Sequence, residues 1–443
     1  MTLRPGAMRI LLYSLNYAPE PVGIGRYSGE LGPWLASQGH DVRAICAPPY
    51  FPDWQVGLGR EAGLNRWRLE QREGVRVRRC PLWVPSRPSG LTRLLHLASF
   101  ALSSLPPLLN QLRWRPDVVF CVAPAFFCTP GALLLRQLSG PSCRAWLHIQ
   151  DFELDAAFSL GMLRGGWLRG LAESWEAGRL RDFDVVSSLG PAMLNRLRAK
   201  GVAEERIELL PNWVDLAAIR PQSPRERGSN PYRRELGLRE DQLAVMYSGS
   251  MNNKQGLDLI AETIVRRPPD PRLVWLLAGE GPTRVVLERV SAGREDVRLL
   301  PLQPAERMND WLNAADIHLL PQKASAADLV LPSKLLGMLA SGRPVLACSP
   351  VGSELAELAD QAGLCVRPDD PQAFLAGLEA LLASPRLRLE KGERGRQLAE
   401  ERYGREAVLT RFEQRLVKLT ATAAATAAAG RGSRNTPFPP ASN

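Results

Sequence analysis

Apolar runs with the spacing of buried strands alternate with helical patterns along most of this chain, and the alternation occurs twice. MRILLYSL (Met8–Leu15) predicts the first strand, and a Pro/Gly-rich loop covers residues 19–25. Leu31 and Leu35 then mark one face of a helix that ends at Gly39. Strands separated by helices form parallel sheets with right-handed crossovers. Six later runs continue the pattern: Val42–Cys46, Val75–Arg79, Asp117–Val122, Ala145–Ile149, Asp184–Ser188 and Ile207–Pro211.

A polar segment rich in Pro, Gly and Ser, PQSPRERGSNP (Pro221–Pro231), interrupts this pattern and predicts a surface loop or linker. Six more apolar runs follow it: Leu243–Gly249, Leu273–Gly279, Val297–Pro301, Ile317–Pro321, Pro344–Cys348 and Leu364–Pro368. A chain of 443 residues is too long for one ordinary core. We therefore expect an α/β fold of two Rossmann-like, doubly wound domains that face a central cleft, with ligands at the carboxyl ends of the strands.

The expected boundaries place the N-terminal domain at residues 8–220 and the C-terminal domain at 232–405. A C-terminal helix should follow at 406–419. The last segment, 420–443, is low in complexity and predicts a disordered tail.

Composition limits the class of protein without deciding it. The formal net charge is +10, which favours an anionic partner such as a phosphorylated substrate, a membrane surface or nucleic acid. The seven cysteines form no CxxC pair, so neither a disulfide framework nor a zinc site is expected, and a reducing cytosol fits best. An uncharged run at Val118–Leu135 contains two prolines, and it predicts a buried strand, a loop and a helix start rather than a membrane span.

Three glycine-containing loops follow predicted strands. They are Gly23-Ile24-Gly25-Arg26, the segment GSMNNKQG from Gly249 to Gly256, and Gly279-Glu280-Gly281-Pro282. Glycine lets backbone amides approach a phosphate, and Lys254 adds a full positive charge. Any one of these loops could equally be a tight turn. Together, in both halves of the chain, they predict a diphosphate site without a metal.

Two further groups of polar residues are candidates for the site. His148 and Asp151 lie just past a predicted strand, where ligand-facing residues occur in this fold. A structural histidine and a solvated acidic turn, shared with Glu153 and Asp155, are the alternatives. Ser333 is a plausible helix N-cap, and Lys334 either enters the cleft or is an ordinary surface lysine.

The stretch from Arg60 to Arg93 holds nine arginines, no lysine and three acids, and it includes Trp67 and Trp83. The apolar segment Leu94–Asn110 follows at once. This combination suits an anionic membrane face. A solvated arginine-rich surface is the alternative, and RNA binding is disfavoured because no stacking motif is present.

An ordered set of motifs resembles the retaining GT-B glycosyltransferases of family four, and among them those of colanic acid and other exopolysaccharide biosynthesis. The motifs span about Met8 to Tyr403. They are NYAPEPVGIGRYSGELGPWLASQGHDVR, APPYFPDWQV, LHIQDFELDAAF, LLPNWVDL, YSGSMNNKQGLDLI, LLAGEGP, AADIHLLPQKASAADLVLPSKLLGMLASGRPVLA and SPVGSELAEL.

The resemblance implies roles for individual residues. The C-terminal domain would bind the nucleotide sugar, and the N-terminal domain would face the acceptor. The implied catalytic residues are His148, Asp151 and Lys254. The implied donor-binding residues are Gly23, Gly25, Arg26, Ser250, Lys254, Gly279, Gly281, Ser333, Lys334 and Glu354.

This chain departs from the family pattern at two places. Ser250 stands where many relatives carry an arginine, and Arg26 is a candidate to supply that charge. Leu329 and Gly337 stand where many relatives carry two glutamates. Asp328 and Glu354 are candidates to replace them.

We therefore predict an enzyme that moves a sugar, with GDP-fucose as the donor suggested by the resemblance, onto a lipid-linked exopolysaccharide oligosaccharide with retention. It would act in the cytoplasm at the inner face of the plasma membrane, without a cofactor, a metal or nucleic acid. A nucleotide-sugar epimerase of the same fold and a non-catalytic polysaccharide-assembly protein remain the alternatives.

Overall fold

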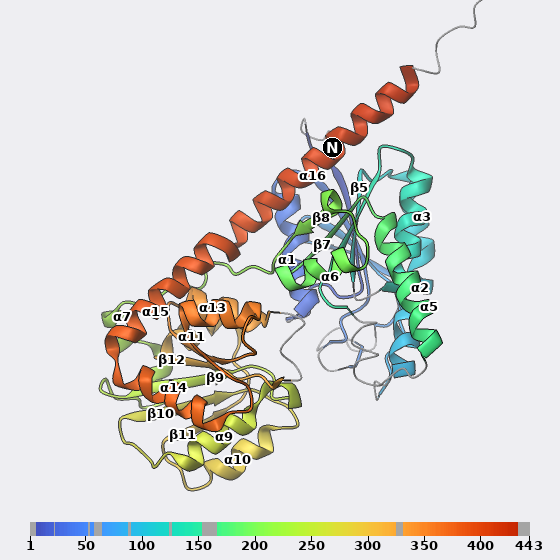
Figure 1. Ribbon diagram of the computed structural model, residues 1–443. Helices are drawn as coiled ribbons and strands as arrows, with labels where there is room; N and C mark the ends of the chain where they lie inside the picture. Colours follow the sequence, from blue (N-terminus) through green and yellow to red (C-terminus); the bar gives the residue numbers. More distant parts are fainter. Residues whose placement is uncertain are drawn as a thin grey trace, which may run out of the picture. The chain divides into compact units, whose positions relative to one another are not determined.

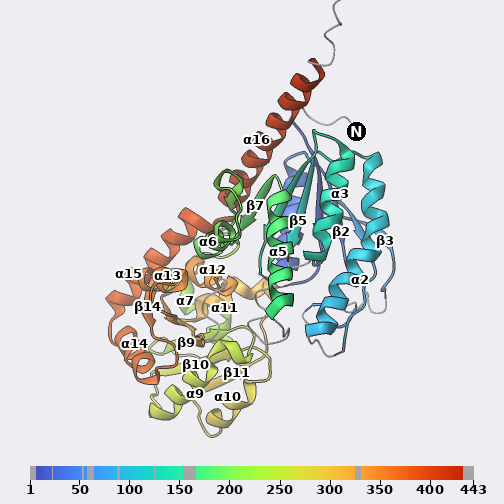
Figure 2. The ribbon, with the colours of Figure 1, turned by 45° about the vertical axis from the view of Figure 1, so that its right-hand side comes forward.

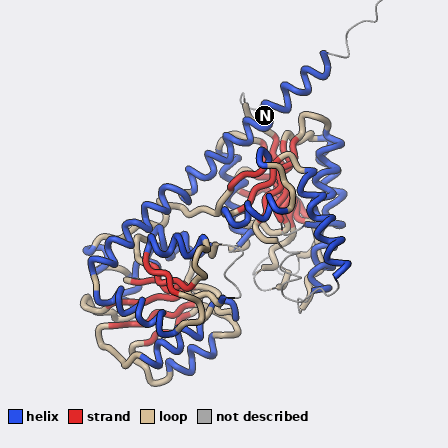
Figure 3. Tube along the Cα trace, viewed as in Figure 1, coloured by secondary structure: helices blue, strands red, loops and turns tan. Residues whose placement is uncertain are grey.

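The computed structural model describes residues 6–21, 23–51, 54–56, 64–86, 90–123, 126–152, 166–324 and 331–432. The chain divides into two compact units, and each contains a sheet with helices packed on it (Figures 1 and 3). The first unit takes the chain up to Leu189, Met193–Leu210 and everything from Leu409 on. The second unit takes Gly190–Ala192 and Pro211–Val408, so residues 211–220 belong with the second unit.

The first unit is built on an eight-stranded sheet with the order β3-β4-β2-β1-β5-β6-β7-β8. Its strands are β1 (Arg9–Ser14), β2 (Asp41–Cys46), β3 (Arg68–Arg72), β4 (Val75–Arg79), β5 (Val118–Ala123), β6 (Arg144–Ile149), β7 (Val185–Ser188) and β8 (Ile207–Leu209). All pairs are parallel except β3 with β4. In the centre, Leu12 pairs in register with Ala44 of β2 and with Phe120 of β5. All of β5 is buried, as expected of a central parallel strand covered on both faces.

Helices cover this sheet. They are α1 (Gly23–Ser37), α2 (Gly90–Leu109), α3 (Thr129–Ser139), α5 (Gly166–Asp182) and α6 (Pro191–Ala199), with short 3-10 turns at Asn110–Arg113, Phe126–Cys128 and Glu204–Arg206. The uncharged run from Val118 is β5 and the start of α3, as predicted. Among the described residues, no helix combines the length and the apolar content that a membrane crossing requires.

The second unit is built on a six-stranded parallel sheet with the order β11-β10-β9-β12-β13-β14. Its strands are β9 (Leu243–Ser248), β10 (Leu273–Ala278), β11 (Val297–Leu300), β12 (Ile317–Leu320), β13 (Val345–Cys348) and β14 (Gly363–Val366). Numbered from β9, this is the order 3-2-1-4-5-6 of dinucleotide-binding domains. Every strand expected from the sequence is present, and the prediction of a doubly wound α/β fold is confirmed.

Both faces of this second sheet are buried. Successive side chains of a strand point to opposite faces, so alternate residues of β9 pack into two different clusters. Val245 and Tyr247 pack into one cluster with Trp275, whereas Ala244 and Met246 pack into another with Trp311. The helices of the unit are α7 (Pro224–Gly228), α8 (Pro231–Glu235), α9 (Leu257–Arg266), α10 (Arg284–Ser291), α11 (Met308–Ala314), α12 (Ser333–Ala340), α13 (Glu354–Ala362), α14 (Pro371–Ala383) and α15 (Pro385–Leu398), with 3-10 turns at Asn253–Gln255 and Ala305–Arg307 and a π-helical turn at Ala399–Tyr403.

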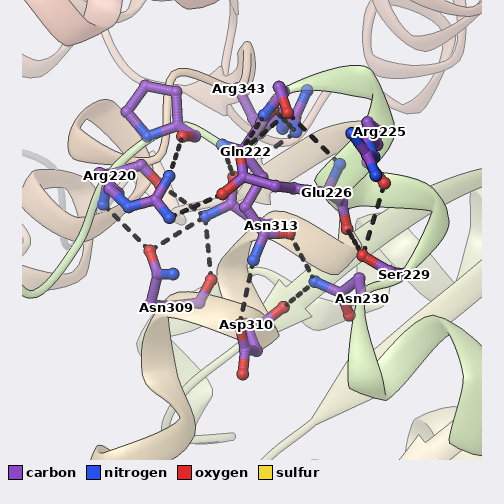
Figure 4. Close-up of polar contacts among 12 residues, drawn as sticks. Arg220, Gln222, Arg225, Glu226, Ser229, Asn230, Asn309, Asp310, Asn313 and Arg343 are labelled. Carbon is purple, nitrogen blue, oxygen red and sulfur yellow. Dashed lines mark hydrogen bonds and ion pairs between the residues drawn. The ribbon is translucent and has the colours of Figure 1, made fainter.

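The polar segment before β9 is ordered rather than a loose surface loop. Helices α7 and α8 begin at side-chain caps from Ser223 and Asn230. Asn230 is 1% exposed, and its side-chain nitrogen donates to the Asp310 carbonyl at 2.8 Å (Figure 4). Asn313 of α11 accepts from the Gln222 amide at 2.9 Å. These contacts attach the segment to α11, which no local pattern in the sequence predicts.

A buried carboxylate completes this attachment. Asp316 lies just before β12, is 9% exposed, and accepts from Arg227 (3.0 and 2.9 Å), Arg233 (3.2 Å) and the Ala244 amide (2.8 Å). Asp316 therefore joins both short helices to the first strand of the unit.

The last helix, α16 (Arg405–Gly432), begins in the second unit and continues into the first. Phe412 packs edge-on against Phe120 (5.2 Å between ring centroids) and Trp146 (5.0 Å). The helix runs past its expected end at 419 through an alanine-rich stretch, because alanine has the highest helix propensity. The tail expected to be disordered is thus helical up to Gly432, and residues 433–443 lie outside the described residues.

Candidate functional site

The topology of the second sheet marks one position as the place for a ligand. β9 pairs with β10 on one side and with β12 on the other, so the crossovers that follow β9 and β12 leave in opposite directions. Ligands of doubly wound sheets bind beyond the carboxyl ends of the strands at this switch point. The loop Gly249–Gly256 follows β9 directly, and α12 follows the connection from β12.

Lys334, in the first turn of α12, reaches back to this loop. Its ammonium donates to Gln255 Oε1 at 2.6 Å and to the Tyr247 hydroxyl at 3.2 Å, and it lies 4.3 Å from the centre of the Tyr247 ring. Burial lowers the pKa of Lys334 to about 7. The two acceptors are neutral, and an ammonium has three N–H donors. The protonated Lys334 therefore has a donor to spare, and no described carboxylate pairs with its charge.

The loops after β9 and β10 pack backbone against backbone. Gly249 N donates to Ala278 O at 3.0 Å, and Met251 N donates to Glu280 O at 2.8 Å. A Cβ at Gly279 would lie 1.9 Å from Gly249 O, and one at Gly281 would lie 2.4 Å from Met251 O. Both positions also have a positive φ (150° and 147°). Gly279 and Gly281 are thus required for this close backbone approach, and a tight turn by itself explains both glycines.

Ser250 lies on the loop between these two bonded amides. Its own amide donates to no described residue. The Ser250 carbonyl accepts from the Tyr247 hydroxyl at 2.6 Å. Ser250 therefore offers a backbone donor on the loop that follows β9.

Lys254 lies in the short turn that follows, with an exposed side chain. Asn252 caps this turn by accepting from the Lys254 amide at 3.0 Å. Among the described residues, no carboxylate lies within ion-pair distance of Lys254. Most other cations of this unit have such a partner; Lys323, for example, pairs with Asp258 at 3.3 Å. Two lysines without a described counterion on neighbouring segments are typical of an anion site.

The amino end of α12 supplies further donors. Its N-cap residue is Pro332, which provides no side-chain acceptor, and the exposed Ser333 is the first helical residue. The amides of Ser333 and Lys334 have no acceptor among the described residues. The expectation that Ser333 caps the helix is thus wrong, because Pro332 is the N-cap residue. Backbone amides without an acceptor at a helix amino end attract anions.

Glu354 begins α13, whose N-cap is Ser353. Burial, and after it the Glu357 carboxylate, raise the pKa of Glu354 to about 7. Asp328, the candidate to replace the first family glutamate, and Leu329, which stands at that glutamate's position, lie outside the described residues. Gly337 is described, and a Cβ there would lie 3.1 Å from Leu312 Cδ1.

The glycine loop of the first unit is organised around a carboxylate. Glu20 is 3% exposed and accepts from Asn16 Nδ2 (2.9 Å) and from the Tyr50 amide (3.1 Å). A Cβ at Gly25 would lie 2.4 Å from Glu20 Oε2. Gly25 thus makes room for Glu20, whereas Gly23 has a positive φ (59°) and open space above its Cα.

Arg26 is engaged locally. Its Nε donates to Glu30 Oε1 at 2.9 Å, and its guanidinium lies 5.6 Å from the Tyr27 ring centre. It is therefore not the spare cation that would replace the family arginine at Ser250.

His148 ends up inside an aromatic cluster at the carboxyl end of β6. It is 4% exposed, its Nδ1 is 2.9 Å from Ser187 Oγ, and its ring stacks on Phe120 at 5.8 Å. Burial lowers the pKa of His148 to about 3, so the imidazole is neutral at physiological pH. Asp151 lies two residues past the strand, and Glu153 and Asp155 lie outside the described residues.

The sequence-predicted residues thus fall into two groups. Ser250, Lys254, Ser333 and Lys334 gather at the switch point of the second unit, whereas Gly23, Gly25, Arg26, His148 and Asp151 belong to the first unit. Tyr247 and Gln255, which hold Lys334, were not predicted. Their signal is weak because Tyr247 looks like a core residue of a strand and Gln255 like a loop residue. The described residues contain no cluster of three or more His, Cys, Asp or Glu that could hold a metal ion.

Two Rossmann-type units in one chain are the architecture of GT-B glycosyltransferases. Solved structures of such enzymes share the fold. Sucrose-phosphate synthase from Thermosynechococcus elongatus superimposes with a TM-score of 0.71 at 18% identity, covering 93% of this chain and 99% of that one. HepE from Anabaena, solved with UDP and glucose, gives a TM-score of 0.65 at 12% identity, covering 92% and 99%.

Sequence comparison establishes the family. Residues 22–213 match the glycosyl transferase 4-like domain, and residues 242–384 match glycosyl transferases group 1. WcaI of Escherichia coli K12, whose name assigns it to glycosyl transfer in colanic acid biosynthesis, is 40% identical over 91% of this chain and 98% of its own length. A D-inositol 3-phosphate glycosyltransferase of Xylanimonas cellulosilytica is 31% identical over 50% of this chain and 53% of its own. The chain belongs to the family-four glycosyltransferases, as its motifs predicted.

Proposed function

We propose that this glycosyltransferase takes a sugar from a nucleotide-diphosphate donor and adds it, with retention, to a lipid-linked oligosaccharide of exopolysaccharide assembly at the inner face of the plasma membrane. Support comes from WcaI, which is named for colanic acid biosynthesis. HepE, which was solved with UDP, supports a nucleotide donor. GDP-fucose is the donor to test first, because the resemblance to the colanic acid enzymes suggested it.

One observation carries the proposal. Lys334 is a partly buried ammonium that contacts only neutral described partners at the switch point of a nucleotide-binding sheet. A cation held in this way is stabilised when an anion arrives. A diphosphate fits because Lys254, the Ser250 amide and the amino end of α12 offer further donors on the adjoining segments.

The same donors suit the chemical step. As the bond between the sugar and the diphosphate breaks, negative charge builds on the phosphate oxygens. Lysines and oriented amides stabilise that charge, and one such donor is typically worth about 3 kcal/mol. Retention would follow if the acceptor attacks the face that the diphosphate leaves, with a phosphate oxygen taking its proton. No metal and no enzyme nucleophile would be required.

Residues of the first unit would contact the sugar and the acceptor. The neutral imidazole of His148 would offer a hydrogen bond rather than a charge, and Asp151 would lie beside it just past the same strand. Glu354 is proposed to hold the ribose, because Gly337 brings no carboxylate. Gly279 and Gly281 would shape the wall next to the base.

The test has two stages. Thermal-shift and calorimetric titrations with UDP, GDP and ADP would identify the nucleotide, and the corresponding sugars would follow, with EDTA present to test metal independence. Incubation with an undecaprenyl-diphosphate oligosaccharide should then give a product whose anomeric configuration, read by NMR, matches the donor. A changed free sugar released without acceptor would indicate an epimerase. Absence of any nucleotide binding would indicate a non-catalytic assembly protein.

A further inference from the structure

Helix α2 has apolar side chains on two opposite sides. One side, with Leu97, Phe100 and Leu108, is buried against the first unit. The other side carries Leu91 (67% exposed), Leu95 (52%) and Leu102 (72%). Positions 91, 95 and 102 lie in one stripe because side chains four and seven residues apart share a helix face. A helix of this kind leaves a continuous apolar stripe in solvent.

Two tryptophans extend the stripe. The Trp67 indole N–H donates to the Ser103 carbonyl at 3.0 Å, yet the residue is 56% exposed. The Trp83 amide donates to Ser99 Oγ at 2.9 Å, and Trp83 is 47% exposed. Both are thus attached to α2 through their polar atoms while much of their surface stays in solvent. We call Trp67, Trp83, Leu91, Leu95 and Leu102 the α2 face.

The neighbouring helix adds to this surface. In Figure 2, α3 runs beside α2 on the same side of the first unit's sheet, as it does in Figure 1. Leu134 (40% exposed) and Leu138 (56%) of α3 are also in solvent. Seven large apolar side chains exposed on two adjacent helices and their flanks are more than scattered surface residues, and such patches mark interaction sites.

Charge selects the partner. Helix α2 contains no acidic residue, and its single charged residue is Arg93. The exposed Arg66 precedes Trp67. The acids of the adjoining hairpin are paired: Glu70 lies 2.7 Å from Arg79, and Glu73 lies 4.0 Å from Arg72. Arg93 lies on the other side of α2 from the leucines, so Arg66 is the cation beside the α2 face. An apolar stripe with tryptophans, next to an exposed arginine and without an unpaired acid among the described residues of the helix and the hairpin, suits the headgroup boundary of an anionic bilayer.

We propose that the α2 face docks this protein on an anionic lipid bilayer, with the leucines and tryptophan rings in the acyl boundary and Arg66 at the lipid phosphates. The inference deepens the proposed function, since a lipid-linked acceptor requires an enzyme that works at a bilayer. Binding to a bilayer can nevertheless be measured without a sugar donor or acceptor.

The experiment uses the full chain and extruded vesicles, either phosphatidylethanolamine with phosphatidylglycerol or neutral phosphatidylcholine. The test variant is Leu95→Glu with Leu102→Glu. The matched control is Val265→Glu with Leu389→Glu, two apolar residues of the second unit that are equally exposed (66% and 62%). Far-ultraviolet circular dichroism and the thermal shift given by UDP or GDP show that each variant folds and keeps its donor site.

In co-sedimentation, the wild type and the control variant should bind anionic vesicles and bind neutral vesicles only weakly. The test variant should bind anionic vesicles at least about tenfold more weakly than the wild type. Equal binding by test and control variants would overturn the proposal. The proposal would also be overturned if the wild type were a dimer that does not bind vesicles and the test variant were a monomer, because the α2 face would then bind a second copy of the chain. Nucleotide binding without vesicle binding would remove only the docking surface, whereas vesicle binding without nucleotide binding would remove only the proposed function.

Discussion

Replacing Lys334 by methionine should make the protein more stable and less able to bind its donor. Methionine keeps the length and the apolar stem of lysine but removes the charge. Burial lowers the pKa of Lys334 from 10.5 to about 7, so the native fold holds its proton far less tightly than the unfolded chain does. The difference corresponds to about 4 kcal/mol at pH 7 as an upper bound.

Partial exposure and the contacts with Tyr247 and Gln255 reduce this figure. We expect the methionine variant to gain about 2 kcal/mol at pH 7, which corresponds to about 4–8 °C in Tm for a domain of this size. Below pH 7 the lysine is protonated in both the folded and unfolded states, and the gap between the two proteins should be constant. Between about pH 7 and 10 the lysine is protonated in the unfolded wild type but largely neutral in the folded one. The free energy of unfolding of the wild type therefore rises with pH, and the difference in stability between the methionine variant and the wild type shrinks.

The assay is differential scanning calorimetry of both proteins from pH 6 to 9, with Lys391→Met of α15 as the matched control. The Lys391 ammonium donates to the Asp360 carbonyl, far along the chain from the site, and its variant should bind UDP or GDP like the wild type. Donor binding supplies a second readout. UDP or GDP should bind the Lys334 variant at least about tenfold more weakly, since a hydrogen bond to a charged group is lost. Wild-type binding at pH 8 should take up a proton, seen by calorimetry in buffers of different ionisation enthalpy. A methionine variant that is less stable at pH 7, or that binds nucleotide as tightly as the wild type, would refute this reasoning.

Three further predictions follow from single residues. Lys254→Ala should leave the circular dichroism spectrum and Tm unchanged, because the side chain is exposed, and should lower the transfer rate by about 100-fold; near-wild-type turnover would contradict the assignment of Lys254. Asp316→Asn should destabilise the second unit by about 3 kcal/mol in urea unfolding, because it leaves Arg227 and Arg233 without their buried carboxylate; a loss below about 1 kcal/mol would show that water replaces the carboxylate. As pH falls from about 6 to 4, the wild type should lose stability relative to His148→Asn, because burial lowers the pKa of His148 to about 3 and only the unfolded chain takes up the proton; parallel pH curves would place that imidazole in a more polar setting.

The central strands could be predicted from the sequence because each is a continuous apolar run, which is what burial on both faces of a parallel sheet demands. β3 could not. Its sequence, RLEQR, contains one apolar residue, and its exposure alternates at the edge of the sheet. It is a strand because β4 offers an unpaired edge and Glu73 and Gly74 form the turn with positive φ (45° and 83°). The short helices α7 and α8 could not be predicted from the local sequence either. The buried Asp316 that anchors them lies about 90 residues further along the chain.

The sequence predicts where the candidate residues lie more completely than what they contact. The switch point and the loops beside it follow from strand order, and Ser250, Lys254 and Lys334 lie on the loop and the helix expected for them. What their side chains contact depends on residues distant in sequence. Lys334 donates to the side-chain oxygen of Gln255, 79 positions away in the sequence, and to the Tyr247 hydroxyl, 87 positions away. Gly25 looked like part of a phosphate loop, and only the fold shows that Glu20 fills the space above it.

The departures from the family pattern bear on how charge is balanced in the second unit. Ser250 brings no charge, and Arg26 is paired with Glu30, so within the described part of the chain the cations beside the switch point are Lys254 and Lys334, and Lys334 is fully charged only when it holds its proton. Gly337 lies against Leu312 and brings no carboxylate to α12. Without that acid, the field at the amino end of the helix is more positive than a glutamate would leave it. Under the proposed function, a diphosphate would meet the charge of Lys254 and would raise the pKa of Lys334 until it is charged as well, so the serine at position 250 would be compatible with donor binding.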